Sequence, residues 1–241
     1  MSNKILKLED EKSVMQFLRE PTVKIAEVIT GILASEKKDW KLSAGKLVQA
    51  TIKGNLLTQL GREIEQYRKE GKIKEDYFAT HKNRASLYEL LKFLDEKVPD
   101  EELFSAIKSI FFSGINSDAT SQDEALAYEF LDTAKKLSGT EVLILRANID
   151  LVHGKKSDSI TEDQLKTARN DRATWRRIIA RQMGYGDMSS IIAKYEMNLE
   201  LHGLISPRAD NPSFQSDFLP TQNLRLTEMG FKFCEFITNY E

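Results

Sequence analysis

Cysteine, proline and long apolar runs are scarce in this sequence of 241 residues. The single cysteine, Cys234, excludes an intrachain disulfide and is typical of proteins in a reducing compartment. No apolar run approaches the about 18 residues of a membrane span, and the N-terminus lacks the apolar core of a signal peptide. We therefore expect a cytoplasmic protein without a transmembrane helix.

An excess of charge of one sign is also missing. The chain has 35 Lys and Arg against 37 Asp and Glu, a formal net charge of −2. This balance provides no whole-chain positive field that would attract nucleic acid or an anionic membrane. Any such binding would need a local basic patch.

Recognisable catalytic and metal-binding patterns are absent from the sequence. His81, His153 and His202 are far apart and have no companion at a metal-ligand spacing. No phosphate-binding glycine loop, dinucleotide fingerprint or nucleophile elbow occurs, and Cys234 has the apolar neighbours of a core residue. We predict no metal, no cofactor and no enzymatic activity. An enzyme built from scattered residues is the alternative.

Helical periodicity is what the sequence has in abundance. A long helix is predicted over 43–70, ending at Gly71, and it carries Gly54 and Gly61 seven residues apart on one face. Glycine inside a helix costs about 1 kcal/mol relative to alanine, so close packing must offset this cost. The packing partner is either another helix of the same chain or, in self-association, a second copy.

Further helices follow, with candidate capping residues at several starts. They are predicted over 86–94, 100–114, 125–137, 141–152, 162–183 and 187–202. The pairs Ser121–Glu124 and Thr161–Gln164 have the capping-box spacing, and Thr140 and Asp187 are further candidate N-caps. We expect an all-α helical domain over 1–137 and a second domain over 138–241.

The second domain has the element order of a winged helix. Three helices are followed by an apolar strand start at 204–205, a loop over 206–222 that would form the wing, and a strand at 224–226. Leu224 and Leu226 are predicted to face the core and Arg225 to face outward. Thr227 is the expected N-cap of a last helix, whose predicted buried residues are Met229, Phe233, Phe236, Ile237 and Tyr240. The predicted fold is thus mainly α, with a small β-hairpin in the winged-helix-like domain. The middle helix, 162–183, is long for a compact helix-turn-helix.

A basic stripe is the main candidate binding feature. It consists of Arg169, Arg172, Arg176, Arg177 and Arg181. Such a stripe is either a solvated face paired with nearby acids, a site for an acidic protein partner, or a phosphate or nucleic-acid site. The candidate recognition helix, 187–202, carries Lys194 against three acidic residues, a formal charge of −2. This charge disfavours DNA binding through that helix.

Three stretches carry a resemblance to a known family. The stretches EPTVKIAEVITGIL, LYELLKFLDEKVPDEELFSAIKSIFF and NLELHGLI with LRLTEMGFKF resemble bacterial proteins of the abortive-infection alpha type. The resemblance implies a helical protein with a role in phage defence, and it brings no catalytic residues. From the residues we predict a protein that acts by association with an unknown protein partner or with itself. The alternative is a nucleic-acid-binding regulator that uses the helix from Arg169 to Arg181.

Overall fold

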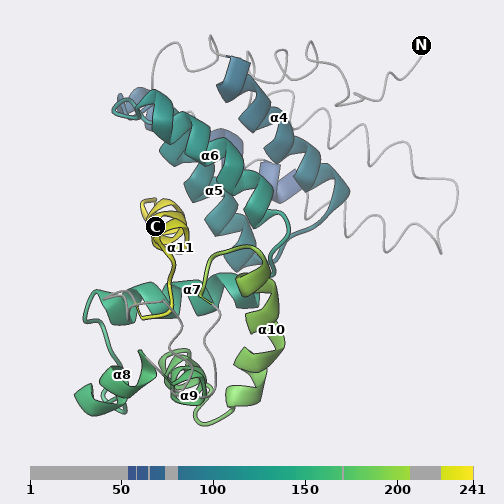
Figure 1. Cartoon of the computed structure of the whole chain (residues 1–241). Helices are drawn as coiled ribbons and strands as arrows, with labels where there is room; N and C mark the ends of the chain where they lie inside the picture. The colour runs from purple at the N-terminus through teal and green to yellow at the C-terminus, as the bar shows by residue number, and fades with distance from the viewer. Residues whose placement is uncertain are drawn as a thin grey trace, which may run out of the picture. The chain divides into compact units, whose positions relative to one another are not determined.

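The structure, a computed structural model, describes residues 54–57, 59–64, 66–73, 81–169, 171–206 and 224–240. These residues are mainly helical, as the sequence predicts (Figure 1). The N-terminal part of the predicted helix 43–70 lies outside the described residues, and so does the predicted wing after Ser206. No helix of the described part combines the length and the apolar character that crossing a membrane requires.

The chain divides into two compact units. The first comprises Met1–Pro99 and Ile110–Lys135, and the second comprises Asp100–Ser109 and Lys136–Glu241. Helix α5, Glu101–Ile115, therefore contributes its first part to the second unit and its last part to the first. The division between predicted domains at 137/138 stays a prediction.

Helices form the first unit. Residues 54–57, 59–64 and 66–69 are helical, and Gly71 follows them at φ +70°, the left-handed conformation expected of the glycine that ends a helix. Helices α4, His81–Glu96, and α6, Ser121–Ala134, pack side by side (Figure 1). The N-cap of α6 is Thr120, which forms a capping box with Asp123, so the predicted box is displaced by one residue.

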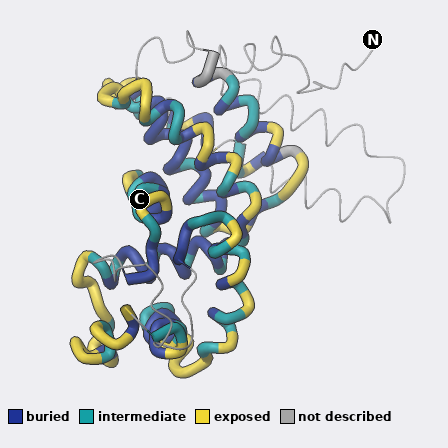
Figure 2. The backbone as a smooth tube through the Cα atoms, viewed as in Figure 1, coloured by how far each residue is buried: buried dark blue, intermediate teal, exposed yellow. Residues whose placement is uncertain are grey.

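The second unit is built around α7, Gly139–Val152, most of which is buried (Figure 2). Its N-cap is Ser138, and Thr140, the predicted cap, lies inside the helix. The other helices of the unit are α8, Glu162–Ala168; α9, Arg172–Gln182; α10, Ser189–Leu201; and α11, Glu228–Thr238. Helix α9 packs on α8, α10 and α7, and α7 also packs on α10 and α11.

The predicted helix 162–183 is two helices. Thr161 and Gln164 form the predicted capping box of α8, but that helix ends at Ala168. Asp171 then takes an extended conformation and accepts a 2.6 Å hydrogen bond from the backbone N–H of Thr174, so it is the N-cap of α9. The prediction of one long helix was wrong because apolar periodicity continues through the break, while the cap depends on one side chain.

The two predicted strand segments meet, but only at one antiparallel bridge, between Ile205 and Leu226. The N–H of Ser206 donates to the carbonyl of Arg225 at 2.8 Å, and the N–H of Thr227 donates to that of Leu204 at 3.2 Å. No longer strand occurs in the part of the chain that the structure describes. The N-cap role of Thr227 is confirmed, since its hydroxyl accepts the N–H of Gly230.

Two predictions of burial around this bridge were wrong. Arg225, predicted to face outward, is fully buried, and Met229, predicted to be buried, is 43% exposed. The strand pattern fails because Leu224 has a φ of +53°, so residues 224–226 are not the regular extended strand in which alternate side chains face opposite sides. Met229 lies in the first turn of α11, before the buried face of that helix begins at Gly230.

Candidate functional site

Two arginines of α9 donate hydrogen bonds to a buried carboxylate. Glu196 of α10 is 0% exposed, and three arginines donate hydrogen bonds to it. Nε of Arg172 lies 2.9 Å from its Oε1, and Nε of Arg176 lies 2.7 Å from its Oε2. Arg225 contacts the same Oε1 through Nη1. Two arginines of α9 and one from the bridge segment thus converge on one side chain.

A second carboxylate completes the arrangement. Glu200, one turn after Glu196, accepts hydrogen bonds from Nη2 of Arg172 at 3.1 Å and from Nη2 of Arg225 at 2.6 Å. Arg172 and Arg176 are four residues apart and share one face of α9, and Glu196 and Glu200 are likewise four residues apart and share one face of α10. The two arginines can therefore pair with the two glutamates across the contact between the helices. We call Arg172, Arg176, Glu196, Glu200 and Arg225 the Glu196 cluster.

All three guanidinium nitrogens of Arg225 donate hydrogen bonds inside the unit. Besides the two carboxylates, it donates to the carbonyl of Ser206 from Nε at 3.0 Å and from Nη2 at 2.6 Å. Its guanidinium lies 4.5 Å from the ring centroid of Trp175, which is also fully buried. Stacking on an aromatic face suits the planar, weakly hydrated guanidinium better than it would suit a lysine ammonium.

The cluster holds its central carboxyl in the ionised form. Burial alone would raise the pKa of Glu196, but hydrogen bonds from Arg172 and the charges and hydrogen bonds of Arg225 and Arg176 outweigh it, so the pKa lies below its ordinary value. Three guanidinium groups face two carboxylates. The cluster is therefore an ion-paired, hydrogen-bonded core element.

The remaining arginines of the predicted stripe lie elsewhere. Arg169 is the C-cap residue of α8 and is exposed. Arg177 is exposed and donates to Oγ1 of Thr174 at 3.1 Å, and Arg181 pairs with Asp187 at 2.8 Å. The five arginines therefore do not form one continuous face. Asp187, predicted to cap α10, is used by Arg181, and the N-cap position of α10 is Met188, which makes no side-chain cap.

The other predicted positions are Gly54 and Gly61. Both are buried in the helical residues of the first unit. What packs against them, another helix of the chain or a second copy, stays a prediction. The sequence pattern did not predict a role for Arg225, because nothing in Leu-Arg-Leu indicates a buried charge. The one indication was the pair of glutamates on one face of the preceding helix.

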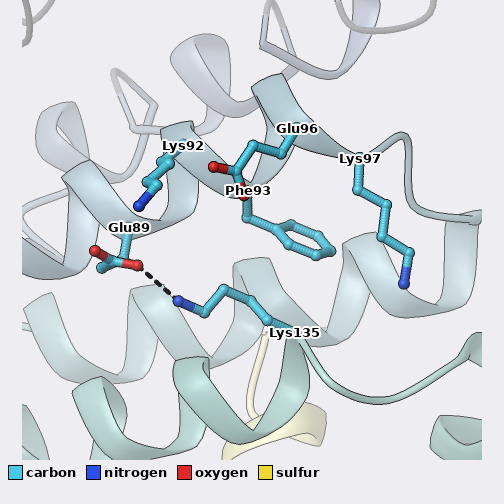
Figure 3. Close-up of a pocket in the computed structure, with 6 residues that line it drawn as sticks. All are labelled: Glu89, Lys92, Phe93, Glu96, Lys97 and Lys135. Carbon is cyan, nitrogen blue, oxygen red and sulfur yellow. Dashed lines mark hydrogen bonds and ion pairs between the residues drawn. The ribbon is translucent and has the colours of Figure 1, made fainter. Parts of the chain in front are cut away.

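Two shallow hollows occur among the described residues. One, of about 300 Å³ in the first unit, is lined by Glu89, Lys92, Phe93, Glu96, Lys97 and Lys135 (Figure 3). In it Lys135 reaches toward Glu89, with Nζ 2.7 Å from Oε2. The other, of about 280 Å³ between α8 and α9, is lined by Asp163, Gln164, Thr167, Thr174, Arg177, Ile178 and Arg181. Neither hollow brings together a nucleophile, a base and oxyanion donors in a recognisable catalytic geometry.

Metal ligands and histidines give no further site in the described residues. No group of three or more His, Cys, Asp or Glu side chains in that part could hold a metal ion. His153 and His202 are the C-cap residues of α7 and α10, each followed by a glycine at positive φ. At a helix C-terminus the imidazole faces the negative end of the helix dipole, which accounts for both positions structurally.

The outward face of α10 is apolar at its C-terminal half. Met197 is 76% exposed and Leu201 is 78% exposed, the highest values among the large apolar residues that the structure describes. They are four residues apart and share a face with Lys194, which is also exposed. The glutamates of the Glu196 cluster are turned toward α9, and Ile192 and Leu199 are buried.

Comparison with known proteins adds no relative: no family model, curated protein or solved structure matches this chain. The resemblance to abortive-infection alpha proteins therefore stays a prediction.

Proposed function

We propose that this protein acts without catalysis, by binding another protein through its second unit, and that this unit is winged-helix-like. The order α7, then α8 with α9, then α10, a bridge and α11 supports the winged-helix assignment. So does the division of the middle segment into two helices, which removes the excess length that the sequence suggested. In this arrangement α10 takes the place of the recognition helix.

The exposed pair Met197 and Leu201 is the observation that carries the proposal. Large apolar side chains that are three-quarters exposed and adjacent on one helix face are unfavourable in water and favourable at a protein interface. Methionine is suited to such a surface because its flexible thioether adapts to different partners. A helix that reads DNA would instead present polar and basic side chains to the groove.

The formal charge of −2 on 187–202 does not by itself repel nucleic acid. The acidic residues of 187–202 are all ion-paired: the exposed Asp187 with Arg181, and Glu196 and Glu200 with the cluster arginines. Nucleic-acid binding is disfavoured because Arg172 and Arg176 are hydrogen-bonded inside the unit and the outer face of α10 is apolar. Arg169 and Arg177 are exposed and support the alternative, a nucleic-acid-binding regulator.

Site-specific photocrosslinking tests the proposal directly. A photoreactive amino acid placed at Met197 in the full chain, in its own cells, should give adducts that protease removes and nuclease does not. The matched control is the same amino acid at Lys166, an exposed position on α8. Adducts at 197 that are destroyed by nuclease, or no adduct beyond those at 166, would overturn protein binding through α10.

A salt titration distinguishes the proposed protein binding from the alternative function, nucleic-acid binding. Fluorescence anisotropy with a random labelled duplex should give no measurable binding at about 0.15 M salt. If the regulator is correct, affinity falls steeply as salt rises, because binding releases counterions from the phosphates. Arg169→Glu with Arg177→Glu would then abolish it, while Lys166→Glu would be the matched control for loss of positive charge in the same unit.

The process we propose for this binding is phage defence, on the resemblance alone. Bacteria that express the chain should then survive phage challenge better than bacteria with the empty vector. Met197→Glu with Leu201→Glu should remove the protection while leaving the protein folded. Equal plating efficiency of phage with and without the chain would contradict the role in defence and leave the protein-binding proposal in place.

A further inference from the structure

The methionines of the second unit all lie at its surface. Met197 is 76% exposed, Met188 57% and Met229 43%, and Met183, the C-cap residue of α9, is half-buried. None of them belongs to the buried core that the described residues form, although methionine is among the residue types most often fully buried in folded proteins. The thioethers of this unit are therefore placed where a solute can reach them.

The single thiol of the chain is, by contrast, shielded from oxidants. Cys234 is fully buried on α11, and burial raises the pKa of its thiol, so the reactive thiolate is disfavoured. A hydroperoxide therefore reaches the exposed thioethers of the second unit before it reaches the thiol. Because these methionines are peripheral, their oxidation changes the surface of the unit and leaves its packed interior in place.

Met197 is the methionine at which such a change alters a candidate binding surface. It lies four residues from Leu201 on the outward face of α10, and these two residues are the exposed apolar pair that carries the proposed protein binding. Oxidation of Met197 replaces an apolar thioether beside Leu201 by a polar sulfoxide whose oxygen is a hydrogen-bond acceptor.

We infer that Met197 is a reversible oxidation site, and that its sulfoxide releases the partner protein from α10 without unfolding the second unit. The release rests on the proposed function. The oxidant is a hydroperoxide such as hydrogen peroxide: a lone pair of Sδ attacks one peroxide oxygen, the O–O bond breaks, and the departing hydroxide takes up the proton of the transferred oxygen. The sulfur loses two electrons, the peroxide gains two, and the products are the sulfoxide and water. Methionine sulfoxide reductases restore the thioether.

The sulfoxide disfavours the complex because its oxygen would have to lose water in an apolar interface. In the free chain the same oxygen stays hydrated, so oxidation stabilises the free state relative to the bound state. One acceptor buried without a donor corresponds to a loss of affinity of about tenfold. The fold is not affected in the same way, since the side chain of Met197 contributes to no buried contact of the core.

Peptide mapping by mass spectrometry, after brief exposure of the full chain to hydrogen peroxide, tests the oxidation site. Met197 should gain one oxygen at close to its rate in the urea-unfolded chain, whereas Met183 should react several times more slowly in the native chain than in the unfolded one. The far-ultraviolet circular dichroism and the urea midpoint should stay constant while Met197 is oxidised. The site is overturned if Met197 reacts no faster than Met183, or if the midpoint falls in step with its oxidation.

Photocrosslinking tests the release of the partner. The photoreactive amino acid is placed at Lys194, an exposed position one turn before Met197, so that Met197 and Leu201 are kept. The purified chain is treated with hydrogen peroxide, the excess is removed with catalase, and the chain is added at limiting concentration to an extract of its own cells. The yield of protein adducts should fall about tenfold after treatment and recover with the two methionine sulfoxide reductases.

Two leucine variants, each compared with itself before and after treatment, locate the effect. Met197→Leu has no thioether at the site, so peroxide should leave its adduct yield unchanged. Met229→Leu removes an exposed thioether of the same unit that lies on α11, and it should lose adducts as the wild type does. Loss of adducts in treated Met197→Leu, or none in treated wild type, would show that the sulfoxide of Met197 does not control binding.

Failure of the inference is separable from failure of the proposed function. If the untreated chain gives no protein adduct at position 194 or at position 197, protein binding through α10 is overturned, and release of a partner with it. The oxidation site at Met197 then stands or falls by the peptide mapping and the urea midpoint, which do not depend on a partner.

Discussion

At the scale of single residues, Glu196 is a fully buried carboxylate that accepts hydrogen bonds from three arginines. A lone carboxylate without exposure would be strongly destabilising, because burial removes its hydration. Here both oxygens accept hydrogen bonds from arginines, and the arginine on the bridge segment is in turn stacked on Trp175. The charge is thereby compensated, but each member of the cluster depends on the others.

Replacing Glu196 by glutamine should therefore destabilise the second unit. The amide has nearly the same shape but no negative charge to pair with the cluster arginines. Its NH2 group would also place hydrogen-bond donors against the N–H donors of an arginine. Loss of one partner from a buried ion pair costs about 3–5 kcal/mol. Urea unfolding followed by circular dichroism should show a lower midpoint, whereas Glu162→Gln, which breaks the exposed pair with Lys156, should leave it almost unchanged. Equal midpoints for Glu196→Gln and wild type would contradict the structural role of the cluster.

The same residue makes stability depend on pH at the acidic side. Because the folded pKa of Glu196 lies below its unfolded value, the unfolded chain binds more protons in the window between the two. The contribution to stability is present above the unfolded pKa, near 4.3, and is lost as pH falls through the folded pKa. Urea midpoints measured from pH 7 down to pH 3 should fall more steeply in wild type than in Glu196→Gln. Parallel curves would show that another group controls acid unfolding.

At the scale of elements, the start of α11 is hydrogen-bonded to the turn that follows α10. The hydroxyl of Thr227 accepts the N–H of Gly230 and donates to the carbonyl of Gly203, at 2.9 and 2.5 Å. Gly230 then passes so close to the turn that a Cβ placed on it would lie 1.8 Å from the carbonyl oxygen of Leu204. Thr227 and Gly230 thus have complementary roles: Thr227 caps the helix, and Gly230 permits its close approach to the turn.

Gly230→Ala should consequently destabilise the protein, although alanine is the better helix former by about 1 kcal/mol. The backbone oxygen of Leu204 accepts the N–H of Thr227 and adjoins the Ile205–Leu226 bridge, so it cannot move away freely, and overpacking of this kind costs about 1–3 kcal/mol or more. The midpoint of urea unfolding should fall, while Met229→Ala, at the exposed neighbouring position, should change it little. A rise in stability for Gly230→Ala would show that α11 does not approach the turn so closely.

The sequence predicted these elements better than it predicted the contacts between them. Thr161, Thr227 and Gly71 were recognised because capping and left-handed turns depend on residues near in sequence. The break at Asp171 was missed because local periodicity outweighed a single capping side chain. Arg225 was missed because its partners lie 25 and 29 residues away, and a one-dimensional pattern cannot show that charges far apart in sequence meet.

At the scale of the whole molecule, the reactivity of a single thiol reports on the packing of the second unit alone. Cys234 is the only cysteine in the chain, so any thiol chemistry reports its surroundings. It is fully buried on α11, and its Sγ lies 3.6 Å from the carbonyl oxygen of Leu145 on α7. Burial also raises the pKa of the thiol above its usual range, so the reactive thiolate is disfavoured as well as shielded.

Native Cys234 should therefore react with a maleimide or an aromatic disulfide only through opening of α11 away from α7. At pH 8 the wild-type rate should be far below that of the urea-unfolded chain, in which the thiol is accessible and ordinarily acidic. Glu196→Gln destabilises the same unit, and each 1.4 kcal/mol lost raises the open population about tenfold, so about 3 kcal/mol predicts a roughly hundredfold faster reaction. Glu162→Gln should react at the wild-type rate. Rapid labelling of the native wild type would show that α11 is not packed on α7 in solution. An unchanged rate in a destabilised Glu196→Gln variant would show that the cluster and α11 open independently.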